Sequence, residues 1–245
     1  MPNRFVELTV RLGLFFAVCI VVDLCLQLFG SFPLAVHRIA YAVVALVLYI
    51  VNRRYMRVRN GRFIHKVYIA AFENDYDTAF TLMNLAIKRQ PKALWLRIEL
   101  AIFIGLSGDV QAFYQQQAQL FADKRFWKSG NRYTLLVLCD AINLLVGSTY
   151  QQLYKSNREE ATSDKHLAGV FHWLFAMSQT YFEGEYDSAV NFAKEFEPPK
   201  CDFFWLFKSF IMFRSFEALR DAEQSRKYRA EYNENPLSTR ICRVD

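Results

Sequence analysis

Two long apolar runs at the start of the chain limit its possible folds more than any other feature. The first run covers residues 10–29 and the second covers residues 32–51, and only GSFP, residues 30–33, is available for a turn between them. A helix rises 1.5 Å per residue, so about 20 residues span the roughly 30 Å core of a bilayer. The sequence therefore predicts a transmembrane helical hairpin. A cleaved signal peptide is disfavoured, because the apolar region is too long and no A-x-A-like site follows it.

The positive charge of the chain is concentrated around these runs. Residues 1–62 carry eight arginines against Glu7 and Asp23, which accounts for the whole formal net charge of +6. The rest of the chain holds 22 basic and 22 acidic residues, so the sequence gives no support for nucleic-acid binding. Basic residues flank both ends of the hairpin and none lies in its turn. Both termini are therefore predicted to be cytoplasmic.

Five arginines follow the second apolar run directly. They are Arg53, Arg54, Arg57, Arg59 and Arg62. Such a group orients a membrane span, and it also attracts anionic lipid headgroups. We therefore expect an integral membrane protein, of the bacterial plasma membrane, whose residues 1–62 form the anchor and its basic juxtamembrane segment.

Three polar residues lie inside the apolar runs: Asp23, His37 and Arg38. Counting inward from the turn places Asp23 near the level of residue 39 on the second helix, so Arg38 or His37 could face it. One interpretation is an ion pair that fixes the register of the two helices near the outer interface. The other is a functional intramembrane site, such as a proton relay or a contact with another membrane protein. The sequence leaves both open.

Beyond residue 62 the pattern changes to amphipathic segments of about 12 to 18 residues, separated by short polar or glycine-containing turns. The chain has 23 Phe and 13 Tyr but only nine Gly and six Pro, which favours packed helices over a turn-rich sheet protein. We therefore predict an all-α protein with a second domain at residues 63–245.

Two stretches of this second domain are nearly identical: ENDYDTAF, beginning at Glu73, and EGEYDSAV, beginning at Glu183. Each places acids at a turn and a small residue, Ala79 or Ala189, where two helices would pack closely. The stretch at residues 72–91 resembles the second half of a tetratricopeptide repeat, and residues 170–199 resemble a whole one, with Trp173 at the large aromatic position. A weaker unit covers residues 93–121.

This resemblance implies an α-solenoid of stacked helix pairs whose first helices line a concave surface that accepts a peptide or a partner helix. Carried over position by position, it implies partner-binding residues on three helices. They are Tyr68, Trp95, Ile98, Phe171, Leu174 and Tyr181, with Ile64, Ile102 and Ser178 beside them. The alternative for each of these side chains is packing against the next repeat. The set lacks the lysine and asparagine that clamp a C-terminal carboxylate, which disfavours binding of chaperone tails.

Signals for chemistry are missing. The sequence contains no phosphate-binding glycine loop, no G-x-S-x-G elbow and no H-E-x-x-H motif. Its four histidines and five cysteines have no metal-ligand spacing, so we expect no metal, no cofactor and no enzymatic activity.

The leading hypothesis is a membrane-anchored helical-repeat scaffold or adaptor that binds a protein partner, itself membrane-bound, at the cytoplasmic face. The alternative is a small accessory subunit of a membrane complex, held mainly through its transmembrane hairpin. The order of two spans followed by repeats is similar to that of HemY-type bacterial membrane proteins, a likeness of architecture alone.

Overall fold

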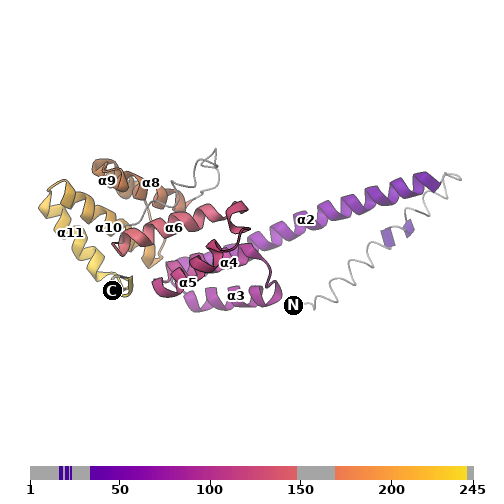
Figure 1. Ribbon diagram of the computed structural model, residues 1–245, viewed down its shortest axis with the longest axis horizontal. Helices are drawn as coiled ribbons and strands as arrows, with labels where there is room; N and C mark the ends of the chain where they lie inside the picture. Colours follow the sequence, from indigo (N-terminus) through magenta and orange to yellow (C-terminus); the bar gives the residue numbers. More distant parts are fainter. Residues whose placement is uncertain (1–16, 19, 22, 24–33, 148–168, 242–245) are drawn as a thin grey trace. The chain divides into compact units, whose positions relative to one another are not determined.

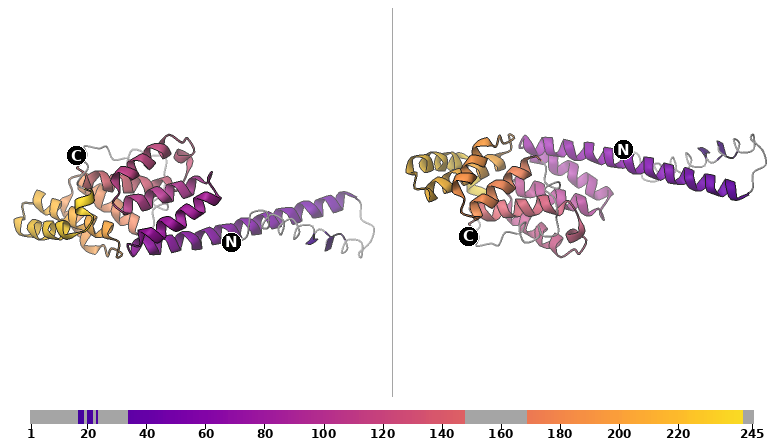
Figure 2. Two further views of the ribbon diagram at one scale, coloured as in Figure 1. Left: turned by 90° about the horizontal axis from the view of Figure 1, so that it is seen from below. Right: turned by 90° about the horizontal axis from the view of Figure 1, so that it is seen from above.

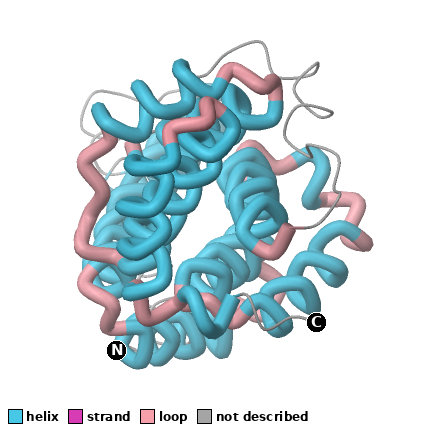
Figure 3. Tube along the Cα trace, turned by 90° about the vertical axis from the view of Figure 1, so that its left-hand side faces the viewer, coloured by secondary structure: helices cyan, strands magenta, loops and turns pink. Residues whose placement is uncertain are grey.

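The computed structural model describes residues 17–18, 20–21, 23, 34–147 and 169–241, and these residues are helical with short connections (Figures 1 and 3). The helices are α2 (Leu34–Phe72), α3 (Tyr76–Arg89), α4 (Leu94–Leu106), α5 (Val110–Phe121), the short 3-10 helix η1 (Phe126–Lys128), α6 (Arg132–Leu145), α8 (Val170–Phe182), α9 (Tyr186–Glu195), α10 (Asp202–Ala218), α11 (Ala222–Glu234) and α12 (Ser238–Ile241). No strand occurs in these ranges, which confirms the all-α class.

The chain divides into two compact units, Met1–His65 and Lys66–Asp245. The boundary lies three residues beyond the predicted one. The first unit contains most of α2, which begins inside the second apolar run; most of the first run lies outside the described residues. No helix within the described ranges combines the length and apolarity needed to cross a membrane.

Five helix ends in the second unit share one backbone feature. Each has a residue with positive φ, and these residues are Asn74, Gly108, Gly147, Gly184 and Arg220, with φ between 62° and 79°. Consecutive members lie 34, 39, 37 and 36 residues apart along the chain. Four of the five are followed directly by an acidic residue that begins the next helix. These helix-starting acids are Asp75, Asp109, Glu185 and Asp221.

The hydrogen bonds at these turns explain the choice of residues. After the positive-φ residue, the amides of Asp75, Glu185 and Asp221 each donate to a carbonyl five residues back, at 2.9 Å in all three cases. This is the Schellman arrangement, which satisfies carbonyls left free at a helix end and needs a left-handed residue there. Three of the four acids also accept a bond from a backbone amide of the new helix, at 3.0 to 3.1 Å. The predicted turns at ENDYD and EGEYD are confirmed, and Ala79 and Ala189 are fully buried.

Helix packing in the second unit follows the same scheme in two places. α4 packs on its neighbours α3 and α5 and also on α6, while α10 packs on α9 and α11 and also on α8. Figures 1 and 2 show α3, α4 and α5 side by side, and α10 beside α11. Contacts between α6 and α8 join the two groups. α4 and α10 are thus each packed between the helix before and the helix after them.

A second set of hydrogen bonds joins the first turn of this unit to the connection between α9 and α10. The Asn74 amide donates from Nδ2 to the Lys200 carbonyl oxygen at 3.1 Å, and its Oδ1 accepts from the Asp202 amide at 3.0 Å. The Tyr76 hydroxyl lies 3.3 Å from Cys201 Sγ and donates to the Leu106 carbonyl at 2.8 Å. Asn235 Nδ2 donates to the Asp202 carbonyl at 2.9 Å. We call this contact, made by residues 74, 76 and 235 to residues 200–202, the clasp.

The cost of positive φ can be measured at Gly184. A Cβ added there meets no atom within 4 Å, so Gly184→Ala changes the backbone preference and adds no clash. We expect the free energy of unfolding to fall by about 1 kcal/mol. Arg220→Asn should change it in the opposite direction, because asparagine tolerates the left-handed conformation that arginine disfavours. Denaturant unfolding of the full chain in mild detergent, followed by tryptophan fluorescence, measures both; equal signs would contradict the interpretation.

The clasp can be tested with Asn74→Gly, because glycine keeps the positive φ and removes both amide hydrogen bonds. We expect a loss of about 1 to 3 kcal/mol in the free energy of unfolding, since the Asp202 amide loses its partner. The matched control is Gly184→Asn, which makes the reverse exchange at an exposed turn and should change stability by less than about 0.5 kcal/mol. A loss of similar size in both variants would show that the clasp contributes nothing.

Candidate functional site

Three of the six predicted partner-binding residues lie in the core. Ile98 and Leu174 are fully buried and Phe171 is 6% exposed, so these side chains pack inside the second unit and offer no surface to a partner in this conformation. The other three, Tyr68, Trp95 and Tyr181, are half-buried. The Tyr181 ring contacts Tyr186 and Phe210, with centroids 5.6 and 6.3 Å away. For Ile98, Phe171 and Leu174, packing within the unit is thus a better interpretation than contact with a partner.

Tyr68 stands in a cluster of aromatic rings that joins four helices. Its ring lies edge-on to Phe103 at 4.9 Å, Phe72 at 5.5 Å and Phe171 at 6.5 Å. Phe204 continues the cluster, with its ring 5.6 Å from Phe72 and 6.0 Å from Phe171. Edge-to-face contacts at these distances are favourable beyond the area they bury. The end of α2 is thereby packed with α4, α8 and α10.

A buried carboxyl group lies against this cluster. Glu99 on α4 is 9% exposed, and its Oε2 accepts a hydrogen bond from the Tyr68 hydroxyl at 2.9 Å. Burial raises the pKa of Glu99 to about 7, although the hydrogen bond from Tyr68 acts in the opposite direction. Burial and the neighbouring Glu99 also raise the pKa of Tyr68 well above its usual value. Glu99 is therefore a carboxyl group that can change its charge near neutral pH.

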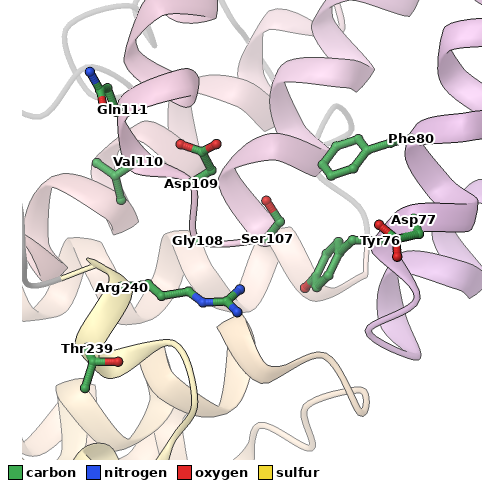
Figure 4. A pocket seen from close by; sticks show the side chains of 10 residues that line it. All are labelled: Tyr76, Asp77, Phe80, Ser107, Gly108, Asp109, Val110, Gln111, Thr239 and Arg240. Carbon is green, nitrogen blue, oxygen red and sulfur yellow. The ribbon is translucent and has the colours of Figure 1, made fainter.

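A surface cavity of about 640 Å³ lies beside the clasp (Figure 4). The start of α3, the turn between α4 and α5, and α12 supply its walls. Its charged groups are Asp77, Asp109 and Arg240, and its rings are Tyr76 and Phe80. In Figure 4 the side chain of Arg240 extends from α12 toward Ser107 and Tyr76. The lining thus combines charged, hydroxyl and aromatic groups.

The residues predicted in the apolar runs are only partly described. Asp23 Oδ1 accepts a hydrogen bond from the Tyr41 hydroxyl at 3.0 Å, a partner that the sequence analysis did not identify. His37 and Arg38 lie in α2, but their side chains fall outside the described residues, so the predicted pairing with Asp23 stays a prediction. The same holds for Arg53, Arg54, Arg57 and Arg59, whereas Arg62 is exposed on α2.

Metal binding has no structural support in the described ranges. No group of three or more His, Cys, Asp or Glu side chains there could hold a metal ion. Cys201 is buried in the clasp, and burial raises the pKa of its thiol, which disfavours the reactive thiolate.

Comparison of the chain with protein-family models, with curated proteins and with solved structures finds no match.

The sequence analysis did not identify Glu99 or Arg220, which the structure shows to be a buried carboxyl group and a left-handed arginine. Glu99 is the lone acid in the apolar segment LWLRIELAIFIGL, and an unpaired acid inside such a segment is a usable signal. Arg220 occupies the left-handed position of a turn, where glycine or asparagine is expected, so it carried no turn signal.

The raised pKa of Glu99 predicts a specific pH dependence. Between pH 4.5 and about 7 the folded state keeps a proton on Glu99 that the unfolded state releases, so rising pH destabilises the fold. Relative to Glu99→Gln, the wild type should lose about 3 kcal/mol of unfolding free energy between pH 4.5 and pH 8. Denaturant unfolding at several pH values measures this difference. Glu195→Gln, at an exposed position, is the control; a flat difference for Glu99→Gln would contradict the assignment.

Proposed function

We propose that this protein is a membrane-anchored helical-repeat adaptor that binds a protein partner at the cytoplasmic face of a membrane. Residues 1–62 would supply the anchor, and the second unit would supply the partner-binding surface. The proposal joins an exposed apolar stripe in the first unit to a recurring helical hairpin in the second.

The apolar stripe supports the proposal that the first unit is anchored in a membrane. Five large apolar side chains of α2 are between 45% and 64% exposed: Ile39, Val43, Leu46, Val47 and Ile50. Their spacing of four, seven, eight and eleven residues from the first places them on one helix face. A contiguous exposed apolar face is unfavourable in water and is expected where lipid or another protein covers it. The arginines that follow the second apolar run agree with lipid as the covering medium.

The recurring turn supports the proposal that the second unit consists of helical repeats. Five left-handed helix ends at intervals of 34 to 39 residues match the length of a two-helix repeat, and the tetratricopeptide period is 34. The packing of α4 on three helices and of α10 on four supports the same assignment, because a repeat buries its faces on its neighbours. We therefore keep the tetratricopeptide-like solenoid as the proposed architecture of residues 63–245.

The partner surface needs revision from the sequence expectation. With Ile98, Phe171 and Leu174 buried, the remaining aromatic candidates are Trp95 and Tyr181. Trp205 on α10 joins them because it is 47% exposed, with Lys208 Nζ 5.7 Å from its ring. Exposed tryptophan is strongly enriched among the residues that dominate binding energy at protein interfaces. We assign Trp205 the central contact.

The accessory-subunit alternative rests on one observation in the first unit. The Tyr41 hydroxyl bonds to Asp23 inside the apolar runs, and polar groups at such positions commonly mediate contacts between membrane helices. In that case the hairpin would hold the partner and the second unit would be supporting structure.

Cross-linking in cells followed by purification of the full chain in mild detergent distinguishes the two. The partner recovered with wild type is quantified for Trp205→Ala and for Asp23→Asn. The adaptor proposal expects recovery to fall about tenfold or more with Trp205→Ala and to stay unchanged with Asp23→Asn. The alternative expects the reverse.

Leu85→Ala is the matched control, because Leu85 on α3 is equally exposed at 46%. Retention of the partner by all three variants would contradict the adaptor proposal with its assigned surface.

A further inference from the structure

A second surface cavity, of about 390 Å³, lies at the turn between α10 and α11. It is lined mainly by arginine: Arg220, Arg226 and Arg229 contribute to its walls together with Glu217, Ala222 and Ser225. The volume is many times the roughly 30 Å³ that a water molecule occupies in the liquid. The cavity can therefore admit a small anion and its remaining hydration water.

The charges in this cavity are not balanced. Glu217 is the only acid that lines it, and its carboxylate is shared by Arg229 at 2.8 Å and Arg214 at 3.1 Å. These two arginines lower the pKa of Glu217, so it stays ionised and fully engaged. Arg220 and Arg226 have no carboxylate partner among the residues that the structure describes. Two guanidinium groups are thus left to face the cavity and solvent.

The backbone conformation at Arg220 is unfavourable for an arginine. Its φ is +63°, whereas Asn74, Gly108, Gly147 and Gly184 hold the corresponding positions of the other helix ends. A left-handed conformation costs an ordinary L-residue about 1 to 2 kcal/mol, which glycine avoids and asparagine reduces. Side-chain packing does not explain why an arginine, which is unfavourable in this conformation, occupies the turn.

The two turns with the duplicated sequence have no basic residue, whereas the α10–α11 turn has Arg220 next to Asp221 and near Glu223. The stretch at residues 73–77 holds three acids and no base, and so does the stretch at residues 183–187. Basic character is therefore not a general property of these turns. In α11 the bases Arg226, Lys227 and Arg229 follow one another closely, and the acids of this helix, Glu223, Glu231 and Glu234, lie toward its two ends.

We propose that the α10–α11 turn is a binding site for a phosphate group, with Arg220 and Arg226 as its principal ligands. A guanidinium presents paired N–H donors that match two phosphate oxygens, and such charge-assisted bonds are among the strongest hydrogen bonds in proteins. The Ser225 hydroxyl on the cavity wall offers a further donor. The phosphate can belong to a free anion or to a phospholipid headgroup, and the chemistry of recognition is the same. This assignment does not rest on the proposed adaptor function.

The experiment uses the full chain in dodecyl maltoside and isothermal titration calorimetry at constant ionic strength. One arm titrates inorganic phosphate, with chloride as the reference anion. The other titrates dihexanoyl phosphatidylglycerol below its micelle concentration, with dihexanoyl phosphatidylcholine as the reference lipid. We expect saturable binding in at least one arm, and binding weaker by about tenfold or more in Arg220→Asn/Arg226→Gln.

The control is Lys88→Gln/Arg89→Gln, which removes two exposed charges from the end of α3 and should leave binding unchanged. Arg226→Gln alone, which leaves the turn intact, should weaken binding about threefold. Binding of inorganic phosphate identifies a free anion as ligand, and binding of phosphatidylglycerol without inorganic phosphate identifies a headgroup. Absence of saturable binding in both arms, or equal weakening by the α3 control, would overturn the proposal.

Discussion

The clasp is the contact on which the arrangement of the second unit depends most. Asn74 is 126 and 128 residues away from the two backbone groups that it bonds, so no local preference could bring them together. A primary amide offers one donor side and one acceptor, as a peptide group does. Asn74 therefore satisfies the Asp202 amide, one of the N-terminal amides of α10 that lack a helical partner, and the Lys200 carbonyl at once. The left-handed conformation that ends α2 is one that asparagine tolerates, so one residue serves both the turn and the clasp.

Ring contacts near the clasp accompany the burial of Phe171, one of the predicted groove residues. With the α2–α3 turn held against residues 200–202, the ring of Phe72 meets Phe204 and the ring of Tyr68 meets Phe171. Glu99 is buried by the same packing, and among the described residues its side chain accepts a hydrogen bond from the Tyr68 hydroxyl alone. Its raised pKa is thus a consequence of how the helices converge.

The parts of the fold that the sequence predicted are those with local causes. The all-α class follows from composition and periodicity, and the turns at Gly184 and Asn74 follow from residues that favour positive φ next to helix-starting acids. The turn at Arg220 has the same geometry and the helix-starting acid Asp221, but it lacks a residue that favours positive φ. The clasp could not be predicted, because nothing in one sequence pairs Asn74 with residue 202. Helical periodicity identified Ile98 and Leu174 as members of an apolar face, but it cannot tell an open face from one that distant helices cover.

Glu99 and Arg220 are two positions where the chain retains a residue that the local structure disfavours. A glutamine or an apolar side chain at position 99 would avoid the cost of a buried carboxyl group, and asparagine at position 220 would avoid the left-handed arginine. Neither residue is required by its surroundings: the Tyr68 hydroxyl could donate to an amide, and the side chain of Arg220 is exposed. Local rules are commonly broken at functional sites. In the second unit, charged residues that cost stability are therefore better indicators of function than the apolar helix faces, because the packing of one helix on the next accounts for those faces.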